Sequence, residues 1–238
     1  MRPEFSIPLL LLGTLSVCLA VPWVAEEYPN PMVNPNKCGS NIDGETLWLC
    51  DPDSVLGTDT SSVLSTVKDV NLNSNCVCNC TENPDVGYVV GVAVAEFITS
   101  QHDDQTASLE AFSQTVRENW FETSSCDDKI LLLMVKNDSQ IHLALGSRIN
   151  EILPSEILDN IDRDIEPLLE ASKYTEALEL TLRQLDLAIS ERVGVYATGT
   201  DSTGMTTEEP PEPDNLVWGI LGVIAIMSIL IFHYWIKY

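Results

Sequence analysis

The sequence KILLLMVKNDSQIHLALGSRI, residues 129–149, carries the strongest structural pattern in the chain. Residues 130–135 are apolar without interruption, which is typical of a strand that is buried on both faces of a sheet. A polar turn follows at residues 136–139, and residues 141–145 then alternate between large apolar side chains and either His or Ala. Such alternation is typical of a strand with one buried face and one wetter face. The stretch therefore predicts an antiparallel hairpin.

A second buried strand is expected upstream at residues 88–98, where YVVGVAVAEFI is almost continuously apolar and rich in β-branched residues. Between the two buried strands, apolar residues recur at helical spacing, which predicts an amphipathic helix. Because a strand–helix–strand crossover makes its two strands parallel, the hairpin adds an antiparallel edge to a parallel pair. The inward stripe of the predicted helix consists of Leu109, Phe112, Val116 and Trp120.

Further helices are expected on either side of this core. Residues 61–70 place four apolar side chains on one helical face, a helix begins after Leu153, and another runs from about Thr175 to Val193. Pro167 removes a backbone donor and should break or kink the helix that contains it. The order helix, strand, helix, hairpin, helix, helix predicts an α/β sandwich over residues 61–195, with helices covering a small mixed sheet.

The two ends of the chain predict export and membrane anchoring. Residues 1–20 combine one early basic residue, an apolar run and a terminal Ala, as in a cleaved secretory signal peptide. Residues 215–236 contain no Asp, Glu, Lys or Arg and approach the ~20 residues that a transmembrane helix needs. The expectation is a type I plasma-membrane protein with an extracellular ectodomain and residues 237–238 in the cytoplasm. A GPI anchor attached near residues 202–204 is the alternative.

The segments between the ends and the core differ in composition. Residues 21–60 are rich in Pro, Asn and Gly and show little periodicity, which predicts an extended arm held by cysteines. Residues 196–214 are mainly Thr, Ser, Gly, Pro and acids, which predicts a flexible stalk. The formal net charge of −24 argues against binding to nucleic acid or anionic lipid. It permits a basic protein partner, a cation or simply a well-solvated surface.

Cysteine usage agrees with an exported protein. Loss of Cys18 with the signal leaves six cysteines, and an even number in an oxidising compartment predicts a disulfide framework rather than a thiolate metal site. Six cysteines allow fifteen connectivities, and all of them stay open. If every member of the CVCNC cluster pairs outside that cluster, six connectivities remain. The six residues are Cys38, Cys50, Cys76, Cys78, Cys80 and Cys126.

Two sequons predict N-linked glycan on the exported chain. Asn137, followed by Asp138 and Ser139, lies in the hairpin turn, where exposure is expected. Asn79 lies inside the cysteine cluster, where disulfide formation competes with glycosylation.

Four short motifs stand out in the predicted ectodomain: Tyr28-Pro29-Asn30-Pro31, Lys37-Cys38-Gly39, Cys50-Asp51-Pro52-Asp53 with Leu56 shortly after it, and Glu118-Asn119-Trp120. Together they resemble the modulator-of-levamisole-receptor family. The hairpin at residues 129–149 is similar to the core hairpin of the wider TPM domain. The resemblance covers roughly residues 28–193, and the predicted signal and single anchor agree with it.

This resemblance implies a TPM-like sandwich and the role of an auxiliary subunit. Family members are single-pass proteins whose extracellular TPM domain associates with levamisole-sensitive nicotinic acetylcholine receptors and promotes their gating. The expected partner is therefore a membrane receptor or channel at the synapse, namely nicotinic acetylcholine receptor subunits. No enzymatic activity and no cofactor are expected on this basis. The CVCNC cluster and the acidic stalk do not map onto the family pattern.

Asp51 and Asp53 raise a different possibility, because phosphatases of the haloacid dehalogenase type carry two Asp at this spacing after a strand. Such an enzyme also needs a Lys and further acids for Mg²⁺, for which Asp127 and Asp128 are candidates. Some TPM relatives are described as acid phosphatases or calcium binders, so the same four carboxylates are candidate Ca²⁺ ligands. In the competing interpretation, Asp51 and Pro52 initiate a turn and Asp53 caps it through a backbone bond.

The favoured hypothesis is a cell-surface protein whose TPM-like ectodomain binds a ligand-gated channel and shifts it toward its open state. An extracellular acid phosphatase or a calcium-binding domain that uses Asp51, Asp53, Asp127 and Asp128 is the alternative. An adhesion or scaffold module without effect on gating is a third hypothesis.

Overall fold

The computed structural model describes residues 21–39, 41–42, 45–78, 87–100, 104–122 and 126–198. All of them belong to one compact unit that ends at Thr198. Among them, no helix is both long enough and apolar enough to cross a bilayer. The signal at 1–20, Asn79, Cys80, the anchor at 215–236 and the tail at 237–238 fall outside the described residues. So do residues 199–214 of the expected stalk, whereas its first three residues, 196–198, lie in a helix that ends at Thr198.

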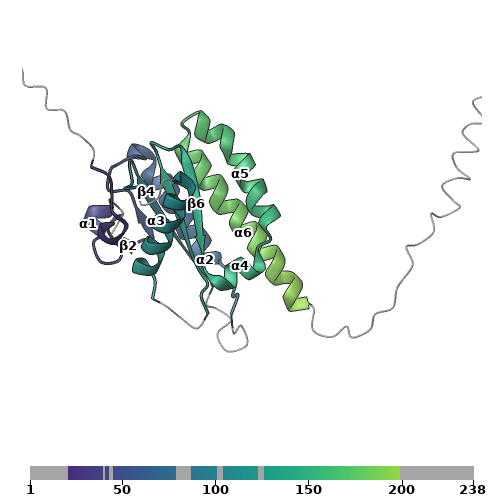
Figure 1. Ribbon diagram of the computed structural model, residues 1–238. Helices are drawn as coiled ribbons and strands as arrows, with labels where there is room; N and C mark the ends of the chain where they lie inside the picture. Colours follow the sequence, from purple (N-terminus) through teal and green to yellow (C-terminus); the bar gives the residue numbers. More distant parts are fainter. Residues whose placement is uncertain are drawn as a thin grey trace, which may run out of the picture. The chain divides into compact units, whose positions relative to one another are not determined.

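From α2 to α6 the chain follows the predicted order of helix, strand, helix, hairpin and two helices, with the short helix α4 added after the hairpin (Figure 1). The last helix starts one residue before its expected position and continues five residues past it. The elements are η1 (Ala25–Glu27), α1 (Pro35–Cys38), β1 (Asn41–Ile42), β2 (Glu45–Thr46), β3 (Leu49–Cys50), η2 (Gly57–Asp59), α2 (Thr60–Asn73), β4 (Val89–Ala95), α3 (Gln105–Trp120), β5 (Lys129–Val135), β6 (Gln140–Leu145), α4 (Ser147–Ile152), α5 (Ser155–Glu170) and α6 (Tyr174–Thr198).

The main sheet is mixed and has the strand order β3-β4-β5-β6. Strands β4 and β5 are parallel from the pair Val89 and Lys129 to the pair Ala95 and Val135. Strand β6 pairs antiparallel with β5, so the predicted parallel pair with an antiparallel edge is confirmed. The other edge is the two-residue strand β3, which pairs parallel with β4 and lies in the segment that was expected to be an extended arm.

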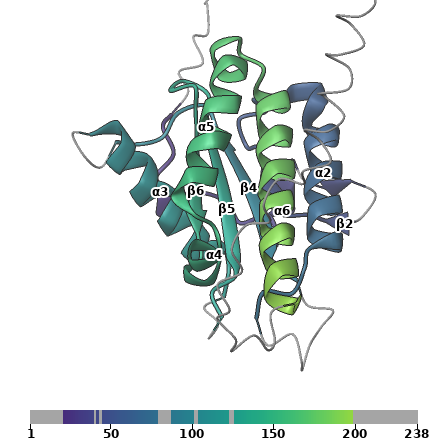
Figure 2. The same ribbon diagram turned by 90° about the vertical axis from the view of Figure 1, so that its right-hand side faces the viewer.

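Helices cover both faces of this sheet, which gives the expected α/β layers. On one face, the sheet packs against α2, α5 and α6 in one apolar cluster. On the other face, it packs against α3 and the N-terminal arm in a second cluster. Figure 2 shows α2 and α6 side by side, with α3 on the other side of the strands. Alternation assigns Val90, Val92, Val94, Ile130, Leu132 and Met134 to the first cluster and Ala93, Ala95, Leu131, Leu133 and Val135 to the second.

Pro167 does not break its helix at the expected place. Helix α5 continues through Pro167 and ends three residues later at Glu170. Proline removes one backbone donor, and the carbonyl that loses it belongs to Arg163, whose exposed position lets water take the place of that donor. The loss of one hydrogen bond in the last turn is therefore tolerated.

The N-terminal arm is packed onto the sheet rather than extended away from it. Tyr28 is buried between the arm and α3, with its ring 5.8 Å from Phe112 and 6.1 Å from Trp120. Its hydroxyl accepts a hydrogen bond from the backbone N–H of Val94 (3.0 Å) and can donate to the carbonyl of Val94 (2.7 Å) or Cys50 (3.0 Å). Burial, followed by the charge of Asp51, raises the pKa of Tyr28 well above its usual value, so this hydroxyl remains a donor. Tyr28 therefore joins β3 to β4 just beyond their last ladder pair.

We expect Tyr28→Phe to destabilise the fold by about 1–3 kcal/mol, because it leaves the buried N–H of Val94 without its acceptor. Denaturant unfolding of the two proteins measures this difference. Tyr174→Phe, at the half-buried start of α6, is the matched control and should change stability by less than about 0.5 kcal/mol. Equal stability of Tyr28→Phe and the unsubstituted protein would contradict the bridging role of the hydroxyl.

Candidate functional site

The turn after β3 is held by Asp51. This side chain is buried, and its two oxygens accept hydrogen bonds from the backbone N–H groups of Val55 (2.8 Å) and Leu56 (2.9 Å). Burial raises the pKa of Asp51 and the neighbouring charge of Asp53 adds to this, while the two backbone bonds act in the opposite direction. Because both oxygens are bonded to its own turn, Asp51 has the geometry of a turn cap rather than that of an exposed nucleophile.

Asp53 has a different structural role from the one expected. It does not cap its own turn; instead its Oδ2 accepts from the indole N–H of Trp23 (2.9 Å) and from the backbone N–H of Glu96 (2.8 Å). Asp51 opens the turn as expected, since its carbonyl accepts from the N–H of Ser54 (3.1 Å), and its side chain, not that of Asp53, also caps the turn. Asp53 instead joins the start of the arm to the chain just after β4. Local spacing cannot reveal this role, because its partners lie 30 and 43 residues away in the sequence.

The proposed group of four acids is not brought together. Asp51 and Asp53 follow β3 and lie level with the carboxyl end of β4, whereas Asp127 and Asp128 precede the first residue of β5. Since β4 and β5 are parallel and in register, these two pairs lie at opposite ends of the sheet. About six residues at ~3.3 Å each separate them, which is roughly 20 Å. A shared site for a metal ion or a phosphate is therefore excluded for this set of four carboxylates.

Asp127 links α3, β5 and α4. Its Oδ1 accepts from the guanidinium of Arg117 (2.6 Å) and its Oδ2 from the backbone N–H of Ser147 (3.0 Å). Burial alone raises the pKa of Asp127, but the bonds from Arg117 and Ser147, together with the charges of Arg117 and Lys129, bring it below its usual value. Asp128 forms an ion pair with Lys129 (2.8 Å). These acids stabilise the amino end of β5.

Two disulfides connect described cysteines, Cys38 with Cys50 and Cys78 with Cys126. Cys76 is disulfide-bonded as well. Outside the CVCNC cluster only Cys38, Cys50 and Cys126 are left as partners. Because Cys38 and Cys50 pair with each other, the condition that every member of the cluster pairs outside it is wrong. Cys78, Cys126 and Asp128 lie close enough for a metal site, but the two sulfurs are joined to each other and offer no thiolate.

The sequon at Asn137 lies where the sequence placed it. Asn137 is exposed in the turn between β5 and β6. Its side-chain amide donates a hydrogen bond to the neighbouring carboxylate of Asp138 (3.3 Å). A glycan attached there would project from the end of the hairpin.

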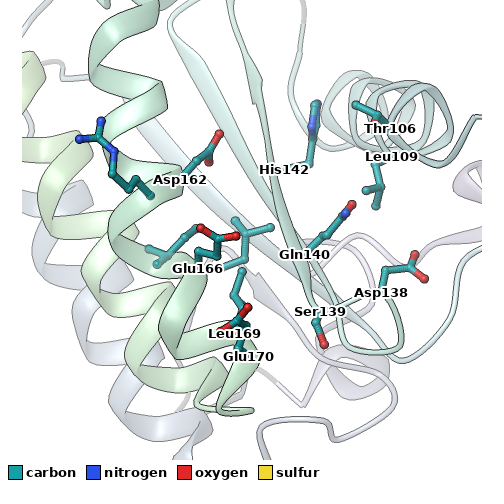
Figure 3. Close-up of a pocket in the computed structure, with 13 residues that line it drawn as sticks. Thr106, Leu109, Asp138, Ser139, Gln140, His142, Asp162, Glu166, Leu169 and Glu170 are labelled. Carbon is teal, nitrogen blue, oxygen red and sulfur yellow. The ribbon is translucent and has the colours of Figure 1, made fainter.

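A groove that the sequence did not predict lies beside the hairpin turn and the first half of β6, Gln140–His142, between α3 and α5, and has a volume of about 650 Å³ (Figure 3). We call it the β6 groove. Four carboxylates line it: Asp138 in the hairpin turn and Asp162, Glu166 and Glu170 on α5. Arg163 and His142 also line it. The sequence carries a signal for this wall, because acids recur at i, i+4 and i+8 on α5 beside the apolar stripe that predicts the helix.

The floor of the β6 groove is less polar than its α5 wall. Leu109 of α3, Ile141 of β6, and Ile165 and Leu169 of α5 line it. Burial lowers the pKa of His142 below its usual value, and the charges of Glu110 and Asp162 act against this. A half-buried imidazole and an apolar floor beside an acidic wall are features of a binding surface.

We expect Asp51→Asn to destabilise the protein by about 1–3 kcal/mol, because an amide nitrogen would face one of the two backbone N–H donors. Denaturant unfolding measures this, with the exposed Asp69→Asn as control at less than about 0.5 kcal/mol. A generic phosphate ester tests the enzymatic alternative in parallel. Turnover that Asp51→Asn abolishes without loss of stability would contradict the capping role.

Asp127→Asn should lower stability by about 1 kcal/mol at pH 7. The native pKa of Asp127 is below its usual value, so its ionised form contributes stability that is fully present above the unfolded-state pKa of about 3.9. That contribution disappears as the pH falls through the lower native pKa. Denaturant unfolding at pH 7, 5 and 3 should therefore show a difference between the two proteins that shrinks only at the lowest pH. A difference that does not depend on pH would contradict this account.

Comparison with known proteins finds one matching family model and several solved structures of low sequence identity. No curated protein matches this chain. The BA42 protein of the psychrophilic bacterium Bizionia argentinensis is 12% identical, with a TM-score of 0.42, over 56% of this chain and 80% of that one. The N-terminal domain of a P. gingivalis protein is 14% identical, with a TM-score of 0.48, over 74% and 96%. An N-terminal domain from Corynebacterium glutamicum is 9% identical, with a TM-score of 0.35, over 66% and 83%.

The family match is more informative than these distant structures. The family model described as modulator of levamisole receptor-1 matches residues 23–139. The matched segment begins at Trp23, which bonds Asp53, and includes Tyr28, Asp51, both described disulfides and the β4–β5 pair. The contacts that build the sheet edge and its arm thus lie inside the family's own segment. Residues 23–139 of this chain thus match the modulator of levamisole receptor-1 family.

Proposed function

We propose that this protein is an auxiliary subunit that binds the extracellular part of a ligand-gated channel and favours its open state. The channel is of the levamisole-sensitive nicotinic acetylcholine receptor type. The observation that carries this proposal is the match of residues 23–139 to the modulator of levamisole receptor-1 family. The finer identification of the domain as TPM-like belongs to the same proposal and is supported by the β5–β6 hairpin and its following helices.

Modulation requires that the ectodomain bind open and closed channel with different affinities, because equal affinity shifts no equilibrium. A ligand that favours one state by 1.4 kcal/mol changes the ratio of states about tenfold. The ectodomain is suited to apply such a bias, since disulfides and a sheet covered on both faces hold its surface in one shape. A rigid surface loses little conformational freedom when it binds.

The proposal includes a type I topology at the plasma membrane, with residues 1–20 as a cleaved signal and 215–236 as the transmembrane helix. The charge-free sequence of residues 215–236 supports this, and so does the disulfide bonding of the described cysteines. Glycan on Asn137 is part of the same proposal and is supported by the exposed turn. Membrane attachment would hold the ectodomain at a high effective concentration beside a channel in the same membrane.

We also propose that the protein acts without catalysis and without a cofactor. The support is geometric, because the oxygens of Asp51 bond the backbone of their own turn and Oδ2 of Asp53 accepts two hydrogen bonds. The acids at the other end of the sheet pair with Arg117 and Lys129. No observation in the described residues favours the phosphatase or the calcium-binding alternative over binding to a channel.

Co-expression with a levamisole-sensitive acetylcholine receptor tests the proposed function. The agonist-evoked current should rise when the full chain is present, because binding to the open state lowers its free energy relative to the closed state. Whole-cell recording measures the current, and surface labelling of the receptor separates gating from changes in receptor number.

A chain that ends before residue 215 is the matched control. Secreted ectodomain should require a higher concentration for the same effect, because it lacks the effective concentration that an anchor provides. Currents that stay unchanged with full-length protein at the cell surface would contradict the proposal.

A further inference from the structure

Strand β6 is the outermost strand of the sheet on one side within the described residues. The N–H of Gly146 donates to the carbonyl of Lys129 (2.8 Å), and the register places these two residues opposite each other. Hydrogen-bonded pairs alternate along an antiparallel ladder, so Ala144, His142 and Gln140 also direct their backbone groups toward β5.

The intervening residues Ile141, Leu143 and Leu145 therefore direct their N–H and C=O groups away from β5, toward the free edge. None of these outward groups has a hydrogen-bond partner in the part of the chain that the structure describes. An unpaired sheet edge is a template for another strand, and proteins commonly block such edges with Lys, Pro or a bulge. Strand β6 has no Lys and no Pro, and its register with β5 is unbroken.

The β6 groove gives the first half of this edge, Gln140–His142, the space for a ligand, and Leu143 and Leu145 continue the edge beyond the groove. Figure 3 shows α5 on one side of β6 and α3 on the other, with the labelled side chains between them. Its volume of about 650 Å³ lies inside the range of about 300–1,000 Å³ that is typical of ligand sites. Six residues of strand extend over roughly 20 Å, enough to pair with a short peptide segment.

The charge of the groove indicates which kind of peptide segment would bind there. Asp162, Glu166 and Glu170 are exposed and follow one another at the spacing of one helical turn, and Asp138 lies at the end of the hairpin. Against these four acids, Arg163 is the one Lys or Arg that lines the groove in the described part of the chain. A second copy of this protein is disfavoured, because each chain has a formal charge of −24.

We propose that the β6 groove binds an extended, basic segment of a partner protein, which adds to the free edge of β6 as a further strand. Main-chain hydrogen bonds to Ile141, Leu143 and Leu145 would supply the affinity, and the acids of α5 would select Lys or Arg side chains. Alternate apolar side chains of the segment would contact the floor formed by Leu109 and Ile165. The proposal rests on the proposed function in one respect, which is that the partner is the extracellular part of a channel.

The test uses the full chain in detergent micelles and a synthetic octapeptide of alternating Lys and Val as probe. Backbone amide hydrogen exchange, followed by NMR, reports the edge directly. The amides of Ile141, Leu143 and Leu145 should exchange at least about tenfold more slowly with the peptide bound, while those of His142 and Ala144 are protected in both states. An octapeptide of alternating Glu and Val should have no effect.

Charge reversal in the groove supplies the second measurement. Glu166→Lys should weaken binding of the Lys-Val peptide about fivefold or more, because it replaces an attraction by a repulsion. Glu191→Lys, the same change on the exposed surface of α6, should leave the affinity within about twofold. Equal weakening by both variants, or binding that leaves the three edge amides unprotected, would overturn the proposal. Binding of Ca²⁺ alone with slowed exchange at the same amides would also overturn it.

The two proposals can fail separately. Peptide binding is measured without any channel, so protection of the edge together with unchanged currents would reject the channel partner and keep the groove. Conversely, a raised current with the unsubstituted full chain, together with no binding of the Lys-Val peptide to that same protein, would reject the groove and keep the channel.

Discussion

The parallel pairing of β4 with β5 is the constraint on which the other contacts depend. Seven consecutive residue pairs join the two strands, and β5 is fully buried from Ile130 to Val135. A parallel pair buried on both faces has to be covered on both faces, which α3 does on one side and α2 and α6 do on the other. New contacts can then form only at the two edges of the sheet, at β3 and at β6.

The two edges of the sheet differ in whether other parts of the chain cover them. At β3, the N-terminal arm closes the edge through Tyr28, the Cys38–Cys50 disulfide and the carboxylates of Asp51 and Asp53. At β6, the backbone edge faces a groove with an acidic wall. The residues of the family motif thus serve the closed edge and maintain the fold, whereas the open edge is the one at which we propose that a partner binds.

Acidic residues have two separate functions in this protein. Asp51, Asp53 and Asp127 accept hydrogen bonds from specific backbone or side-chain donors, and their energetic value lies in the groups they satisfy. Glu166 and Glu170 are exposed beside the groove, where their charge is accessible to a partner of the proposed kind. The acids behind the net charge of −24 are therefore of two kinds: some form hydrogen bonds inside the fold, and others lie on an accessible acidic surface.

Hydrophobic periodicity was sufficient to predict β4, α3 and the β5–β6 hairpin, because each pattern repeats within a few residues and faces one core. Strand β3 was missed because two residues carry no period. The pairing of Cys38 with Cys50 and the bonds of Asp53 to Trp23 and Glu96 join separate segments of the chain. The kinds and order of the elements were thus encoded locally. Which carboxylate meets which donor was settled by folding, because hydrogen bonds act over about 3 Å and that proximity arises only in the assembled sheet.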